Sequence, residues 1–350
     1  MHDVRIGKHT IGAAHAPFVI AEMSGNHNGS LDRAMQIVDA IADSGAHALK
    51  LQTYTADTMT IDLAEREFVI TDKKSLWSGR SLYDLYTEAH TPWEWHGPIF
   101  ERAGNRGLVA FSTPFDATAV EFLESLNVPC YKVASFENID LALIRRVAST
   151  GKPLIISTGL ATLQEISEAV ATAREAGCQD LILLKCTSNY PDSPKDSHLR
   201  TMVHLRDAFG CEVGVSDHTL GIGAALAAVA LGATVIEKHV TLSRSDGGVD
   251  SAFSLEPREL SDLVRESHIA SQSVGSIHYG PTGGERDSLV FRRSLYVVAD
   301  VKRGERLDAG NLRAIRPGLG LAPKYLSNVL GRRAAKDVSR GTPVSWDLID

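Results

Sequence analysis

The chain has 350 residues, 43% hydrophobic and 23% charged, which is ordinary for a globular protein and long enough for a large domain followed by a small one. Its net charge of -7 gives no basic surface, so nucleic acid is not an expected partner. Four widely spaced cysteines without a CxxC pair argue against a zinc ribbon or a disulfide framework. The sequence shows neither an apolar run long enough for a bilayer nor the apolar core of a signal peptide, so we expect a cytoplasmic protein without a membrane partner.

Short apolar runs rich in Val and Ile alternate with amphipathic segments along most of the chain. The runs, typical of buried parallel strands, are residues 18–22, 48–52, 108–111, 130–134, 154–157, 181–185, 212–216 and 234–239. Between them, residues 31–44 and 163–176 carry apolar side chains at helical spacing, and Gly45 and Gly177 follow where each helix would end. Eight such strands alternating with helices predict a (β/α)8 TIM barrel, hence the α/β class.

Two stretches depart from this alternation. Residues 53–107 form a long, aromatic-rich gap, which we interpret as a βα insertion above the barrel mouth. The pattern stops near residues 281–285, where polar and glycine residues indicate a linker. Short strands and turns follow, so we predict a barrel catalytic domain over residues 1–280 and a linker with a small β-rich domain over residues 281–350.

Polar residues concentrate at the carboxyl ends of the predicted strands, where the active site of such a barrel lies. Taken singly they have ordinary explanations: a histidine can pack in a core, a lysine can pair with Glu137 or Glu237, and a serine can cap the next helix. Polar groups at eight consecutive strand ends are harder to explain by packing, because a buried charge is costly unless it is paired or binds something.

The residue types indicate the chemistry. Lys50 and Lys132, with nearby hydroxyls, suit a small anion that carries phosphate and carboxylate groups. His218 and His239 end adjacent strands and could share a divalent ion, and two imidazoles without a nearby cysteine favour a catalytic metal with open positions. Such an ion polarises a carbonyl or activates a water. Together these features suggest carbon–carbon bond formation between an enol and a carbonyl.

The motifs at these strand ends resemble those of the sialic acid synthase family over nearly the whole chain. They are Gly25-Asn-His-Asn28, Lys50-Leu-Gln52, Ser112-Thr-Pro114, Tyr131-Lys-Val-Ala-Ser135, Ile156-Ser-Thr-Gly159, Cys186-Thr187, Tyr190-Pro191, Val215-Ser-Asp-His-Thr219, Ile236-Glu-Lys-His239 and Ser254-Leu-Glu-Pro257. The tail, with Lys302-Arg-Gly304 and Arg316-Pro-Gly318, resembles the SAF (antifreeze-like) domain of the same enzymes. Residues 50–60, 248–254 and 341–347 resemble the pseudaminic acid branch, and Val249 stands where neuraminate synthases more often have proline.

The resemblance implies a role for each matching residue. Phosphoenolpyruvate and an amino sugar would be the substrates, Mn²⁺ or Mg²⁺ would be held by His218 and His239, and the enzyme would be a domain-swapped homodimer. Lys50 and Thr113 would hold the phosphoenolpyruvate carboxylate. Its phosphate would be held by Lys132, Ser135, Ser157 and Ser216, with a further contact from Ser188, where some relatives have Asn. The sugar or the attacking water would face Glu22, Glu137, Tyr190 and Asp250, and Arg316 would reach the sugar bound to the other subunit. Glu22, Lys50, His218 and His239 would form the catalytic set.

Other functions stay open at this stage. Within the family the chain could be an N-acetylneuraminate or a legionaminic acid synthase. A metal-dependent barrel that makes a different 3-deoxy sugar acid would share the anion site but would give no role to the tail. A non-enzymatic scaffold that binds glycans or ice would need none of the lysine, serine and histidine set.

Overall fold

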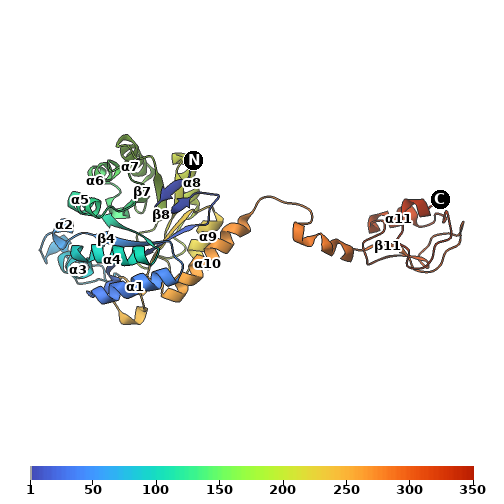
Figure 1. Ribbon diagram of the computed structural model, residues 1–350, viewed down its shortest axis with the longest axis horizontal. Coiled ribbons are helices and arrows are strands. Elements are labelled where there is room, and N and C mark those ends of the chain that lie inside the picture. Colours follow the sequence, from blue (N-terminus) through green and yellow to red (C-terminus); the bar gives the residue numbers. More distant parts are fainter. Residues whose placement is uncertain (1) are drawn as a thin grey trace. The chain divides into compact units, whose positions relative to one another are not determined.

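The computed structural model describes residues 2–350, which divide into two units, one ending at Gly275 and the other running from Ser276 to Asp350 (Figure 1). Within residues 18–239, eight parallel strands close into a barrel in the order β10-β3-β4-β5-β6-β7-β8-β9. The strands are β3 (Phe18–Glu22), β4 (Ala48–Thr53), β5 (Val109–Pro114), β6 (Tyr131–Val133), β7 (Leu154–Ser157), β8 (Leu181–Cys186), β9 (Glu212–Ser216) and β10 (Val235–His239). This confirms the predicted TIM barrel with the predicted strand order.

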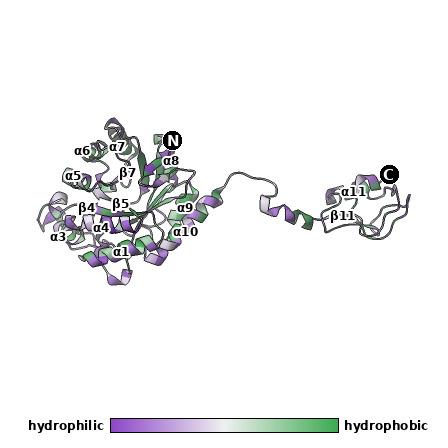
Figure 2. Ribbon diagram, in the orientation of Figure 1, coloured by the Kyte–Doolittle hydropathy of each residue, from purple (hydrophilic) through white to green (hydrophobic). Residues whose placement is uncertain are grey.

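Helices surround the strands, as Figure 1 shows. They are α1 (Leu31–Asp43), α2 (Ala56–Met59), α3 (Leu82–Ala89), α4 (Trp93–Asn105), α5 (Ala117–Ser125), α6 (Leu141–Ala148), α7 (Leu163–Glu175), α8 (Arg200–Phe209), α9 (Gly223–Ala230) and α10 (Pro257–Val274). Figure 2 shows apolar strands in the barrel interior and helices that carry both apolar and polar residues. Within residues 2–350, no helix combines the length and apolar character needed to cross a membrane.

Local sequence explains where these helices begin and end. The Ser30 hydroxyl accepts from the backbone N–H of Arg33 at the start of α1, and Thr162 forms a reciprocal capping box with Glu165 at the start of α7. Gly45 and Gly177, just beyond the two helices, have φ of 82° and 99°, a conformation that glycine adopts without steric cost. Apolar residues at helical spacing then bury one face of each helix against the barrel.

A hairpin of β1 (Val4–Ile6) and β2 (His9–Ile11) lies at the end of the barrel where the strands begin. Val4 and Ile6 belong to the barrel core, and Lys8 Nζ donates to the Gly107 carbonyl, just before β5. The hairpin therefore covers the end opposite the predicted active site.

The second unit has a small core of its own. Its strands β11 (Ser294–Val297) and β12 (Leu312–Ile315) pair antiparallel, and helix α11 (Leu326–Val329) follows. The core includes Leu295, Leu312 and Val329, and Gly304 takes a φ of 79° at the predicted turn. This arrangement is the small β-rich domain expected from the sequence.

Candidate active site

A pocket of about 420 Å³ opens at the carboxyl ends of the barrel strands. It is lined by every barrel residue that the sequence analysis assigned to substrate or metal: Glu22, Lys50, Thr113, Lys132, Ser135, Glu137, Ser157, Ser188, Tyr190, Ser216, His218, His239 and Asp250. Strand register brings several together, since Glu22 lies beside His239 on β10 and beside Lys50 on β4. Arg316 lies just after β12 in the second unit, is exposed, and is not among the residues that line this pocket.

Two buried lysines face two buried carboxylates on the pocket floor. Lys50 Nζ lies 2.9 Å from Glu22 Oε1 and 3.6 Å from Glu237 Oε1, while Lys132 Nζ lies 3.0 Å from the same Glu237 oxygen. Lys50 Nζ also donates to Thr113 Oγ1 at 3.2 Å. The four charges compensate one another, so the lysines can be held at this depth without a bound anion.

The pKa values of these groups reflect their mutual dependence. Burial alone would raise the pKa of Glu22, but Lys50, His239 and Lys132 outweigh it and hold that pKa well below its ordinary value. Burial alone would likewise lower the pKa of Lys50, yet Glu22 and Glu237 raise it, so Lys50 stays charged. Burial prevails at Lys132 and lowers its pKa, although Glu237 and Glu22 act in the opposite direction.

Hydroxyl groups converge at Gly159, just after β7. A Cβ at Gly159 would lie 2.6 Å from Ser135 Oγ and 2.4 Å from Ser188 Oγ, so only glycine leaves room for both. The Gly159 N–H donates to Ser135 Oγ at 3.1 Å. Ser157 Oγ is buried and has no hydrogen-bond partner among residues 2–350. These hydroxyls share the pocket with Lys132, and such a set of groups is suitable for holding a phosphate group.

The two predicted metal ligands lie next to each other, with ring centroids 5.3 Å apart. His218 Nδ1 lies 3.0 Å from the Thr187 carbonyl, and a proton on this nitrogen leaves Nε2 with a lone pair. His239 Nε2 lies 3.2 Å from Glu22 Oε2, and His239 Nδ1 has no hydrogen-bond partner within the described residues. Among residues 2–350 no group of three or more His, Cys, Asp or Glu side chains is arranged to hold a metal ion. The expectation that no cysteine lies near the histidines is wrong, since Cys186 Sγ lies 3.9 Å from His218 Nδ1. Two imidazoles alone would leave the other positions of a bound ion to water or substrate.

Glu137 is a carboxyl group of the pocket whose pKa lies near neutrality. Burial raises its pKa from 4.5 to about 7, and its Oε2 has no hydrogen-bond partner among residues 2–350. A carboxyl group with such a pKa can give or take a proton at neutral pH. Asp250, on the loop after β10, instead accepts from the Ser24 hydroxyl and stays beside His239.

Some lining residues were missed by sequence reasoning. Glu237 was considered only as an ion-pair partner, yet its Oε1 also accepts from Ser216 Oγ at 2.9 Å and so joins the lysines to the serines. Gln52 Nε2 donates to Glu22 Oε1 at 2.7 Å. The sequence did contain a signal for both residues, because side chains two positions apart on a strand point to the same face. Glu237 therefore shares a face with His239, and Gln52 shares one with Lys50.

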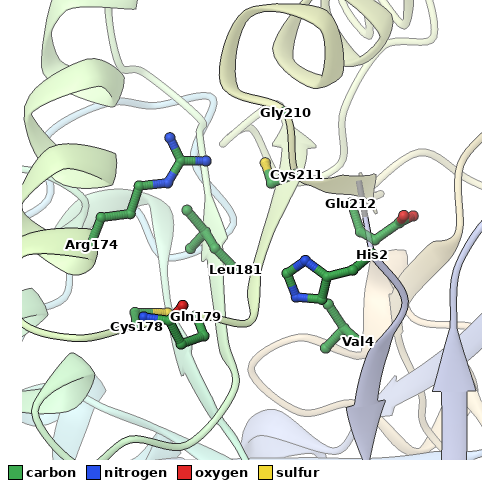
Figure 3. Close-up of a pocket in the computed structure, with 9 residues that line it drawn as sticks. All are labelled: His2, Val4, Arg174, Cys178, Gln179, Leu181, Gly210, Cys211 and Glu212. Atoms are coloured by element: carbon green, nitrogen blue, oxygen red, sulfur yellow. The ribbon is translucent and has the colours of Figure 1, made fainter.

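A second cavity, of about 360 Å³, lies at the end of the barrel where β8 and β9 begin (Figure 3). Figure 3 shows Arg174, Cys178, Cys211 and His2 around it. Burial raises the pKa of both thiols to about 11, so they stay protonated at neutral pH and are poor nucleophiles. The reactive groups thus gather at the opposite end.

Comparison with known proteins agrees with this geometry. The NeuB family matches residues 37–279, and the SAF domain matches residues 292–350. The chain is 42% identical over 336 residues to a pseudaminic acid synthase of Helicobacter pylori, with 95% of this chain and 98% of that protein covered. It is 43% identical over 324 residues to a pseudaminic acid synthase of Campylobacter jejuni, with 93% and 94% covered.

A solved structure supports the same grouping. The N-acetylneuraminic acid (sialic acid) synthetase of Leptospira borgpetersenii, in complex with citrate, matches with a TM-score of 0.73 and 30% identity, over 82% of this chain and 95% of that one. The resemblance to sialic acid synthases, and the expectation of a synthase enzyme, are confirmed. The chain belongs to the NeuB family and ends in a SAF domain.

Proposed function

We propose that the chain is a pseudaminic acid synthase, which condenses phosphoenolpyruvate with 2,4-diacetamido-2,4,6-trideoxy-L-altrose and water to give pseudaminic acid and phosphate. The observation that carries the proposal is the pocket floor, where two buried lysines adjoin a cluster of serine hydroxyls and a pair of histidines. The 42–43% identity to relatives named for this activity favours this branch of the family.

Phosphoenolpyruvate fits the floor as a dianion or trianion. We assign its phosphate to Lys132, Ser135, Ser157 and Ser216, with Ser188 beside them, and its carboxylate to Lys50 and Thr113. The unpartnered Ser157 hydroxyl and the cradle at Gly159 support the phosphate assignment. When phosphoenolpyruvate binds, each lysine replaces part of its contact with a carboxylate by a contact with the ligand. The lysine charges are held in position before the ligand arrives and need little reorientation during the reaction.

His218 and His239 would hold a divalent ion, Mn²⁺ or Mg²⁺, which polarises the sugar aldehyde when bound. The free lone pair on His218 and the unpartnered Nδ1 of His239 support this assignment. Glu22 orients His239 through the 3.2 Å contact. The Tyr190 ring packs against His218 at 4.5 Å, centroid to centroid, with the ring planes tilted by 58°, and limits its rotation.

The remaining residues handle bond formation and proton transfer. A bond forms between C3 of phosphoenolpyruvate and the aldehyde carbon, and the floor fixes the two carbons in reach of each other. Water then adds to C2, and the C2–O bond to phosphate breaks. Glu137, with a pKa of about 7, is suited to move the proton in the water step, and Glu22 and Asp250 face the sugar.

The functional unit would be a domain-swapped homodimer in the cytoplasm. Phe136, Leu160 and Leu220 are exposed on loops that follow β6, β7 and β9, at the end where the pocket opens. Leu319 and Trp346 are exposed in the second unit. Apolar side chains exposed on both units support docking of the small domain of one copy over the barrel of another, which would bring Arg316 to the sugar.

A sugar panel tests the proposed function. The full-length protein is assayed with phosphoenolpyruvate and Mn²⁺ against the diacetamido-trideoxy altrose, its gluco and manno relatives, and N-acetylmannosamine, with product mass and phosphate release as readouts. We expect the altrose derivative to give the highest kcat/KM. A tenfold preference for N-acetylmannosamine, about 1.4 kcal/mol, would move the chain to the neuraminate branch, and preference for another diacetamido sugar would move it to the legionaminate branch.

A further inference from the structure

One wall of the active-site pocket is mainly apolar, and the tyrosines Tyr54 and Tyr86 also line the pocket. The insertion between β4 and β5 supplies Met59, Ile70, Trp77 and Leu85 to this wall, and the loop after β10 supplies Val249. In the proposed function, the polar residues of the pocket floor already bind the anion and the metal. The wall therefore faces whatever part of the substrate extends away from the reacting carbons.

A short hairpin presents two of these side chains. Val69 bridges to Ser81, the Ile70 N–H donates to the Arg80 carbonyl at 2.9 Å, and the Gly79 N–H donates to the Ile70 carbonyl at 2.7 Å. Residues 69–81, which we call the specificity hairpin, thus form a closed loop with Ile70 at its base and Trp77 near its tip. Leu76, beside Trp77, is exposed and does not line the pocket.

Trp77 joins this hairpin to the loop that follows β10. Its indole Nε1 donates to the Val249 carbonyl at 2.9 Å, a contact between residues 172 positions apart. Its ring also lies 5.9 Å, centroid to centroid, from Tyr190. The hydrogen bond from Trp77 to the Val249 carbonyl fixes the position of Val249 and of the neighbouring Asp250, which faces the sugar in the proposed function.

We propose that the specificity hairpin recognises the deoxygenated end of the sugar and is the element that selects a terminal methyl over a hydroxymethyl group. The inference rests on the proposed function, because the sugar aldehyde must lie at the histidines for the other end of its chain to reach the wall. A methyl group buries favourably against Ile70 and Trp77, whereas a hydroxyl there loses its water without gaining a partner. An apolar pocket rejects an added hydroxyl by about 100-fold at most.

A matched pair of substitutions in the hairpin tests the inference. The full-length protein is assayed with two open-chain diacylamino sugars that differ only at C6, one methyl and one hydroxymethyl. We expect the wild-type kcat/KM to favour the methyl sugar by about ten- to a hundredfold. Ile70→Gln should reduce that ratio at least fivefold, mainly through the methyl sugar. Leu76→Gln makes the same chemical change in the same hairpin outside the pocket and should leave the ratio unchanged.

Trp77→Phe tests the hydrogen bond between Trp77 and Val249, since phenylalanine keeps an aromatic face but lacks the indole N–H. It should raise the KM for both sugars and leave the KM for phosphoenolpyruvate within twofold. A wild-type ratio near one, or an Ile70→Gln ratio equal to that of Leu76→Gln, would overturn the role of the hairpin while leaving the synthase activity in place. Absence of product from either sugar with the wild-type protein would instead overturn the proposed function and, with it, this inference.

Discussion

Glu237 Oε1 lies 3.0 Å from Lys132 Nζ, and both side chains are only 2% exposed. The carboxylate thus neutralises a lysine that we assign to the phosphate of phosphoenolpyruvate. Removing one partner of a buried ion pair leaves an uncompensated charge, which is strongly destabilising. The pair therefore links the stability of the ligand-free barrel to its anion site.

The first prediction follows from this link. Glu237→Gln should lower the melting temperature of the ligand-free protein, because Lys132 and Lys50 lose a shared counter-charge at the pocket floor. Phosphoenolpyruvate should then raise the melting temperature of the variant more than that of the wild type, since the ligand supplies the missing negative charge. Differential scanning fluorimetry with and without phosphoenolpyruvate measures both shifts. Equal ligand-induced shifts in the two proteins would contradict the prediction.

The second prediction concerns Glu137, whose pKa is raised by burial from 4.5 to about 7. A raised pKa means that the folded protein binds this proton more tightly than the unfolded chain does. The resulting stabilisation is fully present below pH 4.5 and is lost as pH rises through about 7. Between pH 5 and pH 8, the free energy of unfolding of the wild type should fall relative to Glu137→Gln by roughly 2–3 kcal/mol. Urea unfolding at the two pH values measures the difference.

The same substitution should change the pH dependence of catalysis. If Glu137 moves a proton in the water step, the wild-type profile of kcat/KM has a limb near neutral pH, and Glu137→Gln lacks that limb. A variant with an unchanged limb and full activity would show that the raised pKa has no part in the reaction.

Much of this site could be predicted from sequence because strand ends in a barrel meet by construction. Lys50, Lys132, His218 and His239 are distant in the chain, yet each lies in a barrel strand or just after one, and closure of the barrel brings them to one pocket. The strand order and the helix limits likewise follow from local patterns, such as the glycines after α1 and α7.

The contacts that depend on three-dimensional detail could not be predicted. The hydrogen bond from Trp77 to Val249 joins an irregular insertion to a loop, and neither segment has a period that fixes where its side chains point. The partner of Lys132 could not be predicted either, because Glu137 and Glu237 were equally possible from the sequence. In the structure, the carboxylate oxygen that lies 3.0 Å from Lys132 Nζ belongs to Glu237.

The third prediction concerns the metal. His218→Ala and His239→Ala should each weaken Mn²⁺ binding, measured by titration calorimetry on the metal-stripped protein, and should abolish product formation while the protein stays folded. His204→Ala, which removes an exposed histidine from α8, is the control and should bind Mn²⁺ as the wild type does. Full activity of the stripped wild type in excess chelator would exclude a metal requirement.

The fourth prediction concerns a buried ion pair outside the pocket. Lys238 Nζ lies 3.1 Å from Asp217 Oδ2, with the side chains 0% and 2% exposed, and it also donates to the Thr219 carbonyl. Lys238→Met leaves Asp217 buried without its partner and should lower the free energy of unfolding by about 3–5 kcal/mol. Lys336→Gln, which breaks an exposed pair with Asp347, should cause no measurable change in the same denaturant titration.

The fifth prediction concerns Arg316, which is exposed directly after β12 in the second unit. In a domain-swapped dimer it would contact the sugar at the barrel of the other copy, so Arg316→Ala should raise the KM for the sugar sharply. The KM for phosphoenolpyruvate should change much less, because barrel residues hold that anion. Arg313→Ala removes an exposed arginine three residues earlier and should be silent.

Mixed dimers separate a swapped arrangement from an unswapped one. When an Arg316→Ala chain pairs with a His218→Ala chain, a swapped dimer has one site that combines the intact barrel of the first chain with the intact tail of the second. Its other site carries both defects, so the heterodimer should recover up to about half of the wild-type activity, since additivity holds for independent sites. If each tail served its own barrel, both sites would carry one defect and activity would stay at the level of the single variants. Heterodimers isolated with two different affinity tags, assayed beside each homodimer, distinguish the two arrangements.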